Sequence, residues 1–336
     1  MIVNAPTSSR PAPGEWIQTI LLGGNLAWTT LCLGGYRPET MMVTAGLTCA
    51  TLAVFFVTCG RQGWSWRRMD PAAWWLLAFL FYAAVNVAFV SPVKWLGWAD
   101  WLGWANLIAT FWVVLHGIRS ALTRTLLWSV LVGLGLVGVA MACYQRFLQP
   151  EWLMLGRQQA AQFVGRAGGP FGIPNSFAGF LLLATPAAGV MAFRVQPTAV
   201  GRVWWAWVTL VFALGLVLTL SRGAWIGLAL ALLGGALGFG ELTWKRRLRR
   251  AGLVVAAIAL VAVVLYQTVP QARLRLDRLV DDSGERSRPI LWRAAWQIFQ
   301  EHPIVGSGAG SYAVRFERAR PAGFIDQPQW AHNDYL

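Results

Sequence analysis

Long apolar runs separated by short polar connections make up most of this chain. Nine such runs can be followed from the N-terminus, and most of the connections are short. Several runs approach the roughly 20 residues that a helix needs to cross ~30 Å of hydrocarbon. In lipid the backbone must satisfy its own hydrogen bonds, so runs of this kind form helices. The pattern predicts helices at about 16–35, 41–59, 72–90, 98–117, 125–148, 175–193, 203–220, 223–240 and 252–269.

The chain changes character after residue 269. Residues 270–336 hold 8 of the 14 acidic residues and two of the three histidines. Inside this tail, residues 289–301 predict an amphipathic helix that begins at Pro289, is ended by Pro303, and has one apolar stripe: Trp292, Ala295, Trp296 and Phe299. Tryptophan on the stripe with arginine nearby is typical of a helix that lies at a lipid interface.

Composition indicates a membrane protein, and the distribution of charge predicts its orientation. The chain is 57% apolar and 12% charged, whereas soluble domains carry roughly a quarter charged residues. With the N-terminus inside, thirteen Lys and Arg residues fall in inner segments and six in the short outer ones. Because such residues collect in cytoplasmic loops, the tail is expected on the outer face of a bacterial inner membrane.

The predicted fold is therefore all-α: a polytopic, multi-pass transmembrane helix bundle of about nine spans, with a large periplasmic loop that contains short amphipathic helices. Its expected segments are a cytoplasmic N-terminal tail (1–15), the helix bundle (16–269) and the periplasmic loop (270–336). The first apolar run has no small-residue cleavage site after it, so it is interpreted as a retained signal anchor.

Two compositional features have plain explanations in a membrane protein. The net charge of +14 follows from the basic cytoplasmic loops, so no nucleic-acid partner is expected. Cys32, Cys49, Cys59 and Cys143 lie in or beside apolar runs and match no zinc spacing. They are expected to be packing residues and not metal ligands or disulfides.

Two segments on the predicted outer side contain candidate chemistry. Arg222, within Ser221-Arg222-Gly223, stands at the outer start of the eighth run. It is either an arginine that reaches lipid headgroups or an anion-binding arginine beside a positive helix N-terminus. Residues 168–176 are rich in Gly and Pro and predict an irregular re-entrant backbone, after which Asn175 or Ser176 could cap the next helix.

The tail contains further candidates. Arg286 and Arg288 follow the acidic residues Asp281, Asp282 and Glu285, and they are either part of a solvated charge run or an anion site. Two adjacent acidic residues are weak support for a metal site, so no metal is expected.

Histidines and glycines complete the tail. His332 can act as a general base, whereas His302 is expected to cap a helix end. The third histidine, His116, lies inside the fourth apolar run and is expected to be structural. Residues 306–310, Gly-Ser-Gly-Ala-Gly, lack a surrounding βαβ unit and are interpreted as a flexible hinge instead of a dinucleotide loop.

Taken in order, these segments resemble the O-antigen ligase and O-antigen polymerase superfamily of bacterial membrane glycosyltransferases. The similar pieces are GPFGIPNSFA at 169–178, LSRGA at 220–224, RPILWRAA at 288–295, HPIVGSG at 302–308 and the pair His332-Asn333. The resemblance covers about residues 165–336, and the first five helices match the superfamily only in hydropathy.

This resemblance implies an inverting, metal-independent transfer that needs no cofactor. The donor would be a glycan on undecaprenyl pyrophosphate, and the acceptor a hydroxyl of a lipid, a glycan or a protein. Arg222 and Arg288 match the family's functional arginines, with Arg286 a near competitor for the second position. Arginine suits this task because a pyrophosphate leaving group needs positive charge when no metal is present.

The resemblance assigns the remaining roles as well. His332 would deprotonate or orient the acceptor hydroxyl, and Asn175 and Asn333 would support the site. The family normally continues with further spanning helices after the His-Asn pair, so this chain is expected to be a fragment of a longer product.

An alternative function is a polytopic membrane transporter of small anions. Transporters place polar residues near mid-membrane, often on broken helices, but runs seven to nine contain almost none. Polarity gathers in the outer loop, which favours surface chemistry. A purely structural scaffold would account for the hydropathy but not for the order of the motifs.

Overall fold

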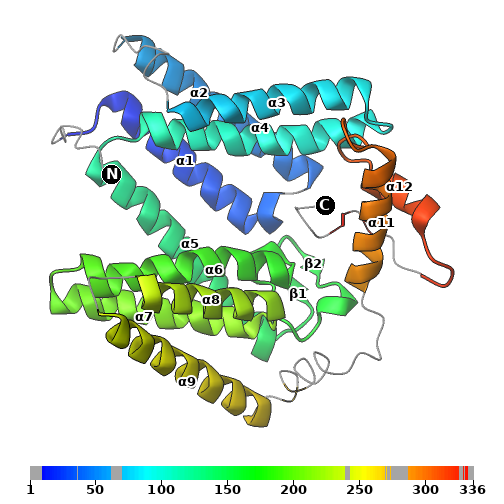
Figure 1. Ribbon diagram of the computed structural model, residues 1–336. Helices are drawn as coiled ribbons and strands as arrows, with labels where there is room; N and C mark the ends of the chain where they lie inside the picture. Colours follow the sequence, from blue (N-terminus) through cyan, green and yellow to red (C-terminus); the bar gives the residue numbers. More distant parts are fainter. Residues whose placement is uncertain are drawn as a thin grey trace. The chain divides into compact units, whose positions relative to one another are not determined.

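A computed structural model describes residues 10–35, 37–61, 70–238, 243–268, 270, 273, 287–324, 328, 330 and 331. Helices make up most of these residues (Figure 1): α1 (Pro13–Leu31), α2 (Pro38–Arg61), α3 (Pro71–Phe89), α4 (Lys94–Gly117), α5 (Ala121–Phe147), α6 (Pro174–Val190), α7 (Ala199–Leu218), α8 (Arg222–Gly238), α9 (Trp244–Thr268), α11 (Ser287–Glu301) and α12 (Tyr312–Ala319). Short helical turns are η1 (Leu33–Gly35), η3 (Ala161–Phe163), η4 (Gly169–Phe171) and the π-helical η5 (Met191–Val195). The strand pairing found in the described part of the chain is antiparallel, between β1 (Trp152–Leu153) and β2 (Arg157–Gln158).

The predicted all-α class is confirmed, and each of the nine apolar runs coincides with a helix, α1 to α9. Six helices of the described residues are long and apolar enough to cross a membrane, namely α2, α3, α5, α6 with η5, α7 and α9. The helix α8 is apolar but shorter, with 17 residues. The count of about nine spans therefore stays a prediction.

The helices pack into two compact units. Unit 1 consists of residues 1–25, 36–126 and 283–336, and unit 2 of residues 26–35 and 127–282. These units follow packing, whereas the three segments expected from the sequence follow membrane compartments, so the segment boundaries stay a prediction.

In unit 1, α4 packs against both α2 and α3 (Figure 1). The start of α1 is tied to the connection between α4 and α5 by Glu15. Its Oε1 accepts hydrogen bonds from the backbone N–H groups of Arg119 (2.8 Å) and Ser120 (2.7 Å) and from the Thr123 hydroxyl (2.6 Å). This buried carboxylate therefore satisfies polar groups at the entry of α5.

The tail contributes α11 and α12 to unit 1. The predicted amphipathic helix is confirmed as α11, which packs on α12 through Leu291, Ala294 and Phe316. Its aromatic stripe faces outward, because Trp292, Trp296 and Phe299 are between 38% and 49% exposed. Outward rings suit the expected interfacial position of this helix.

Unit 2 is built around the pair α6 and α7, with α8 packed on α6 and α9 packed on α8 (Figure 1). Its core contains large side chains of α5, α6 and α7 that are almost fully buried, among them Val139, Phe177, Leu181, Phe212 and Leu216. This core holds the entrance of α6 beside the turn between α7 and α8.

Contacts between loops agree with helices that alternate in direction. Within unit 1, residues 305–309 bind the end of α3, and Glu15 binds residues 119–123. Within unit 2, η1 packs on η4, where an added Cβ at Gly34 would lie 3.1 Å from Phe171. In each pair, both segments are expected on the same membrane side. The compartment that each side faces stays a prediction.

Candidate functional site

A buried glutamine anchors the Gly- and Pro-rich segment before α6. The Gln145 side chain of α5 is only 1% exposed. Its Oε1 accepts hydrogen bonds from the N–H groups of Gly168 (3.0 Å) and Gly169 (2.8 Å), and its Nε2 donates to the Gly169 carbonyl (3.2 Å). The predicted irregular backbone is confirmed, since Gly169 and Gly172 adopt φ of +53° and +69°.

Asn175 does not cap α6. The cap position is Ile173, which makes no side-chain cap hydrogen bond, and the helix begins at Pro174. Proline at the first helical position supplies a helical φ and has no N–H to satisfy, so the helix starts before Asn175 and the capping prediction is wrong. Instead, Asn175 Oδ1 accepts a hydrogen bond of 3.0 Å from the Arg166 guanidinium.

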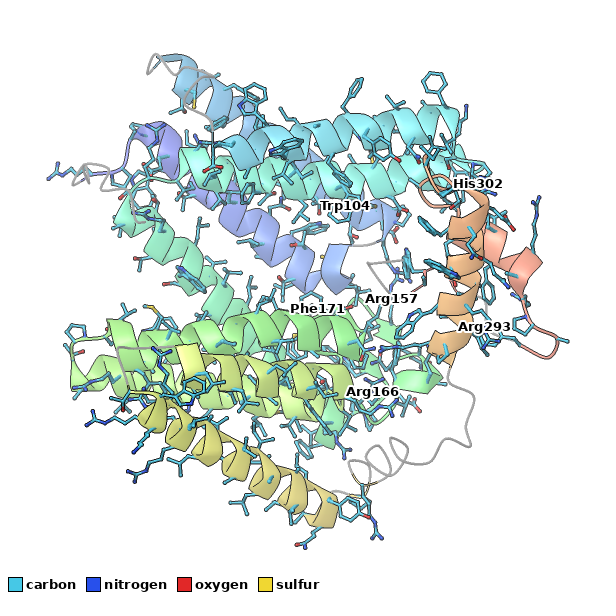
Figure 2. The ribbon with its side chains drawn as sticks, in the orientation of Figure 1. Trp104, Arg157, Arg166, Phe171, Arg293 and His302 are labelled. Carbon is cyan, nitrogen blue, oxygen red and sulfur yellow. The ribbon has the colours of Figure 1, made fainter. Side chains whose placement is uncertain are left out.

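Arg166 joins this segment to the turn between α7 and α8 (Figure 2). Its Nε donates to the Thr219 carbonyl over 3.1 Å, and the neighbouring Ala167 N–H donates to the Leu218 carbonyl over 3.2 Å. Sequence reasoning missed Arg166, although its position three residues before the Gly-Pro motif on the predicted outer side was an available signal.

The turn between α7 and α8 is conformationally strained. Leu220 is a buried, non-glycine residue with φ of +51°, a conformation that L-residues rarely adopt. The Ser221 N–H donates to Thr219 Oγ1 (3.2 Å), and the Ser221 carbonyl accepts the first helical bond of α8 from Trp225. Strained backbone of this kind is frequent at functional sites.

Arg222 opens α8 directly after this strained turn. Its side chain is half-buried, and no hydrogen bond or ion pair of its guanidinium is found within the described residues. The N-terminus of a helix adds a positive potential of its own. Arg222 is therefore a cation in a positive environment, as an anion-binding site requires.

The other predicted site residues belong to the tail. Arg288 lies in the first turn of α11, in unit 1, with an exposed side chain. Arg286, His332 and Asn333 lie outside the described residues, as do Asp281 and Asp282. The structure thus links Asn175 to the α7–α8 turn through Arg166, and it places Arg288 in the other unit.

Unit 1 contains a pocket of about 670 Å³ at the C-terminal part of α3 and the N-terminal part of α4. Its polar lining includes Asn86, Asp100, His302 and the backbone of residues 306–311. Figure 2 labels Trp104 on α4 and His302 after α11, both of which line it. The aromatic lining residues come from α3, α4, α11, α12 and the tail: Phe79, Tyr82, Trp101, Trp104, Phe299, Tyr312 and Trp330.

One wall of this pocket is the glycine-rich loop, which α3 anchors. Asn86 Nδ2 donates to the Val305 carbonyl (2.8 Å), and Asn86 Oδ1 accepts from the Ala309 N–H (2.9 Å). Gly308 has φ of +97°, and a Cβ there would lie 2.5 Å from Ser91 Cα. The interpretation of this segment as a flexible hinge is wrong, because its glycines serve positive φ and close backbone approach.

His302 links α11 to α12. Its Nε2 lies 2.8 Å from the Arg315 guanidinium, which also donates from Nε to the Ser307 carbonyl over 3.1 Å. A guanidinium has only donors, so the imidazole Nε2 is the acceptor in this contact. The partner of this side chain is thus an arginine of α12, whereas the sequence predicted a helix cap.

Tyr312 contributes to the packing of α12 on α11. Its hydroxyl donates to the Leu291 carbonyl over 2.9 Å. Burial raises the pKa of Tyr312 to about 12, because the charged phenolate is disfavoured away from water.

The family model described as O-Antigen ligase matches residues 207–336. This part of the chain is therefore similar to the O-antigen ligase family. The matched stretch begins inside α7 and includes Arg222, Arg288 and the His332-Asn333 pair. Comparisons with curated proteins and with solved structures found no match.

An O-antigen ligase domain on apolar helices supports a membrane enzyme of the glycosyltransferase or ligase type. The resemblance found in the sequence motifs is thereby confirmed at the level of the superfamily. The strained α7–α8 turn, with Arg222 directly after it, lies within the matched O-antigen ligase domain.

Proposed function

We propose that this protein is a membrane glycosyltransferase that transfers a glycan from undecaprenyl pyrophosphate to an acceptor hydroxyl at the periplasmic face. The observation that carries the proposal is the O-antigen ligase match over residues 207–336, a stretch that contains the candidate cations and the His-Asn pair. The acceptor hydroxyl belongs to a lipid, a glycan or a protein.

Charge is the main physical demand of this reaction. The leaving group is a lipid diphosphate, and stabilising its developing negative charge lowers the barrier. Arg222 fits this role because its guanidinium is half-buried, is unpaired within the described residues and stands at the N-terminus of α8. Arg288 or Arg286 would supply the second guanidinium, which makes the site metal-independent.

The chemical step is a single displacement. The acceptor oxygen attacks the anomeric carbon while the bond from that carbon to the pyrophosphate oxygen breaks. Undecaprenyl pyrophosphate leaves with the bonding electron pair, and the hydroxyl proton passes to the His332 imidazole. Attack opposite to the leaving group inverts the anomeric configuration.

Two asparagines support this site in the proposal. Asn175 holds Arg166 by a hydrogen bond of 3.0 Å, and Arg166 in turn binds the carbonyl of Thr219, three residues before Arg222. Asn333 would orient the neighbouring His332. The excess of Lys and Arg in the predicted inner segments supports an inner-membrane protein with residues 270–336 in the periplasm.

The test is glycan transfer by the full chain in proteoliposomes that contain a lipid-linked glycan donor and an acceptor. Arg222→Ala, Arg288→Ala and His332→Ala are each expected to reduce transfer by about 100-fold or more. The fourth variant, Arg286→Ala, decides which tail arginine is used.

Matched controls separate loss of charge from loss of this site. Arg293→Ala removes another exposed arginine of α11, and transfer is expected to stay within about twofold of the unmodified chain, as for a surface change. Undiminished transfer by the Arg222, Arg288 and His332 variants would remove the proposed site. Uptake of small anions by vesicles that lack a glycan donor would favour the transporter alternative.

A further inference from the structure

The pocket of unit 1 contains a carboxylate for which the described residues supply no partner. Asp100 lies in the first two turns of α4 and lines the pocket. No hydrogen bond or ion pair of its side chain is found within the described part of the chain. A carboxylate accepts up to about four hydrogen bonds, so this one is ready to receive donors from a ligand.

Aromatic rings of α3 and α4 line the same pocket as this carboxylate. Trp104 follows Asp100 by one helical turn and is half exposed, so both side chains lie on one face of α4. Phe79 of α3 packs edge-on against Trp104, with ring centroids 5.5 Å apart. The neighbouring Trp101 is fixed by its indole N–H, which donates to the Leu80 carbonyl over 3.0 Å. The rings are thus held in place before any ligand arrives.

The anchored loop makes this arrangement concave. Residues 305–311 close one side of the pocket, and their position depends on Asn86, whose amide binds Val305 and Ala309. The resulting volume of about 670 Å³ lies in the range of about 300–1,000 Å³ that small ligands occupy.

We propose that this pocket is a glycan-binding subsite, in which a neutral sugar ring lies against Trp104 and its hydroxyls donate to Asp100. A sugar ring offers an apolar C–H face for the indole and hydroxyl donors for the carboxylate. The assignment of this sugar to the enzyme's own glycan substrates rests on the proposed function, whereas the binding itself does not.

Other ligand chemistries fit less well. A diphosphate would be repelled by the carboxylate of Asp100. An isoprenoid chain would cover the rings but would desolvate Asp100 and the loop backbone without offering a donor, which is costly. A neutral, hydroxyl-rich ring satisfies both surfaces of the pocket.

The experiment measures binding of a panel of neutral methyl glycosides and disaccharides to the full chain. The protein is held in lipid nanodiscs free of glycoside detergents, since these would compete for the pocket. Saturation-transfer difference NMR identifies which sugars bind and whether ring C–H protons face the protein, and calorimetric titration gives the dissociation constants.

Three pocket variants and one control variant test the assignment. Asp100→Asn keeps the shape but removes the charge, Trp104→Ala removes the stacking surface, and each is expected to weaken binding by about tenfold or more. Trp95→Ala is the matched control, since Trp95 is an exposed tryptophan of the same helix, 71% exposed, that does not line the pocket. Its binding is expected to stay within about twofold of the unmodified chain. Trp104→Phe keeps an aromatic face, so its affinity for the sugar is expected to lie between that of Trp104→Ala and that of the unmodified chain.

Three outcomes would overturn the inference: no sugar of the panel binds, the Asp100 and Trp104 variants bind as well as the unmodified chain, or undecaprenyl phosphate without sugar displaces the bound glycoside. The proposed function is tested independently of the sugar subsite. If sugars bind with the predicted variant pattern but the unmodified chain transfers no glycan, the subsite stands and the transferase proposal falls. If Arg222→Ala abolishes transfer while no sugar binds in the pocket, the reverse holds.

Discussion

The buried side chain of Gln145 allows a direct test of how the candidate site is positioned. Gln145→Leu keeps a similar volume but removes both polar groups. The N–H groups of Gly168 and Gly169 then lose their acceptor. Because Gln145 is 1% exposed, water has little room to replace the lost bonds.

The magnitude follows from these two orphaned donors. A buried hydrogen-bonding group left without a partner costs about 1–3 kcal/mol, so the segment loses about 2–6 kcal/mol of local stability from its two donors. A loss of about 2 kcal/mol already corresponds to about a 30-fold increase in local opening. Opening of this segment releases Asn175 and Arg166 from their places beside the α7–α8 turn.

Hydrogen exchange read by mass spectrometry measures this opening in the peptide that covers residues 166–172. In the Leu variant its amides are expected to exchange about 30-fold faster or more. Gln145→Glu is the control, because it keeps the acceptor for both amides and loses only the donor to the Gly169 and Trp152 carbonyls, so its effect is expected to be smaller. Equal exchange in the Leu variant and the unmodified chain would refute the anchoring role.

Three further predictions concern unit 1. Gly308→Ala places a Cβ against Ser91 at φ of +97°, which costs about 3 kcal/mol and is expected to expose residues 305–311 to limited proteolysis. Gly306→Ala is the control, since no atom lies within 4 Å of its added Cβ, and its effect is expected to be smaller. Equal cleavage of the two variants would contradict this prediction. The pKa of Tyr312 is raised to about 12, so above about pH 10 the unfolded chain releases the phenol proton first and the stability of the fold falls as pH rises. Tyr312→Phe is expected to remove that part of the stability loss, measured by unfolding curves at alkaline pH. Unchanged curves would contradict the prediction. Glu15→Ala removes three hydrogen bonds from the entry of α5 and is expected to destabilise the protein by about 2–4 kcal/mol, measured as a lower Tm. The Tm of Glu15→Gln is expected to be intermediate. An unchanged Tm of the Ala variant would show that these bonds do not contribute to stability.

Several properties of this protein could be predicted from local pattern alone. Runs of apolar residues long enough to cross a bilayer form helices in lipid, so α1 to α9 were predictable. The amphipathic helix α11 was equally predictable, from its proline near the start and its apolar stripe. The order of short motifs was enough to indicate the superfamily, which the match over residues 207–336 bears out.

Residue type alone led to a wrong prediction at two places, because glycine and asparagine each suit two different local structures. Glycines between 306 and 310 suit both a hinge and a tightly packed turn, and only the approach of Gly308 to Ser91 distinguishes the two. Likewise Asn175 suits a helix cap, but the preceding Pro174 starts α6 first and leaves the amide to bind Arg166.

What the sequence by itself determined is the set of helices, because bilayer length and backbone hydrogen bonding act within each segment. What only the tertiary structure decided is which distant residues meet. Asn86 binds Val305 across 219 positions and Arg166 binds Thr219 across 53. Such pairs depend on the packing of whole helices against each other, and that packing arises from summed contacts that no single stretch of sequence contains.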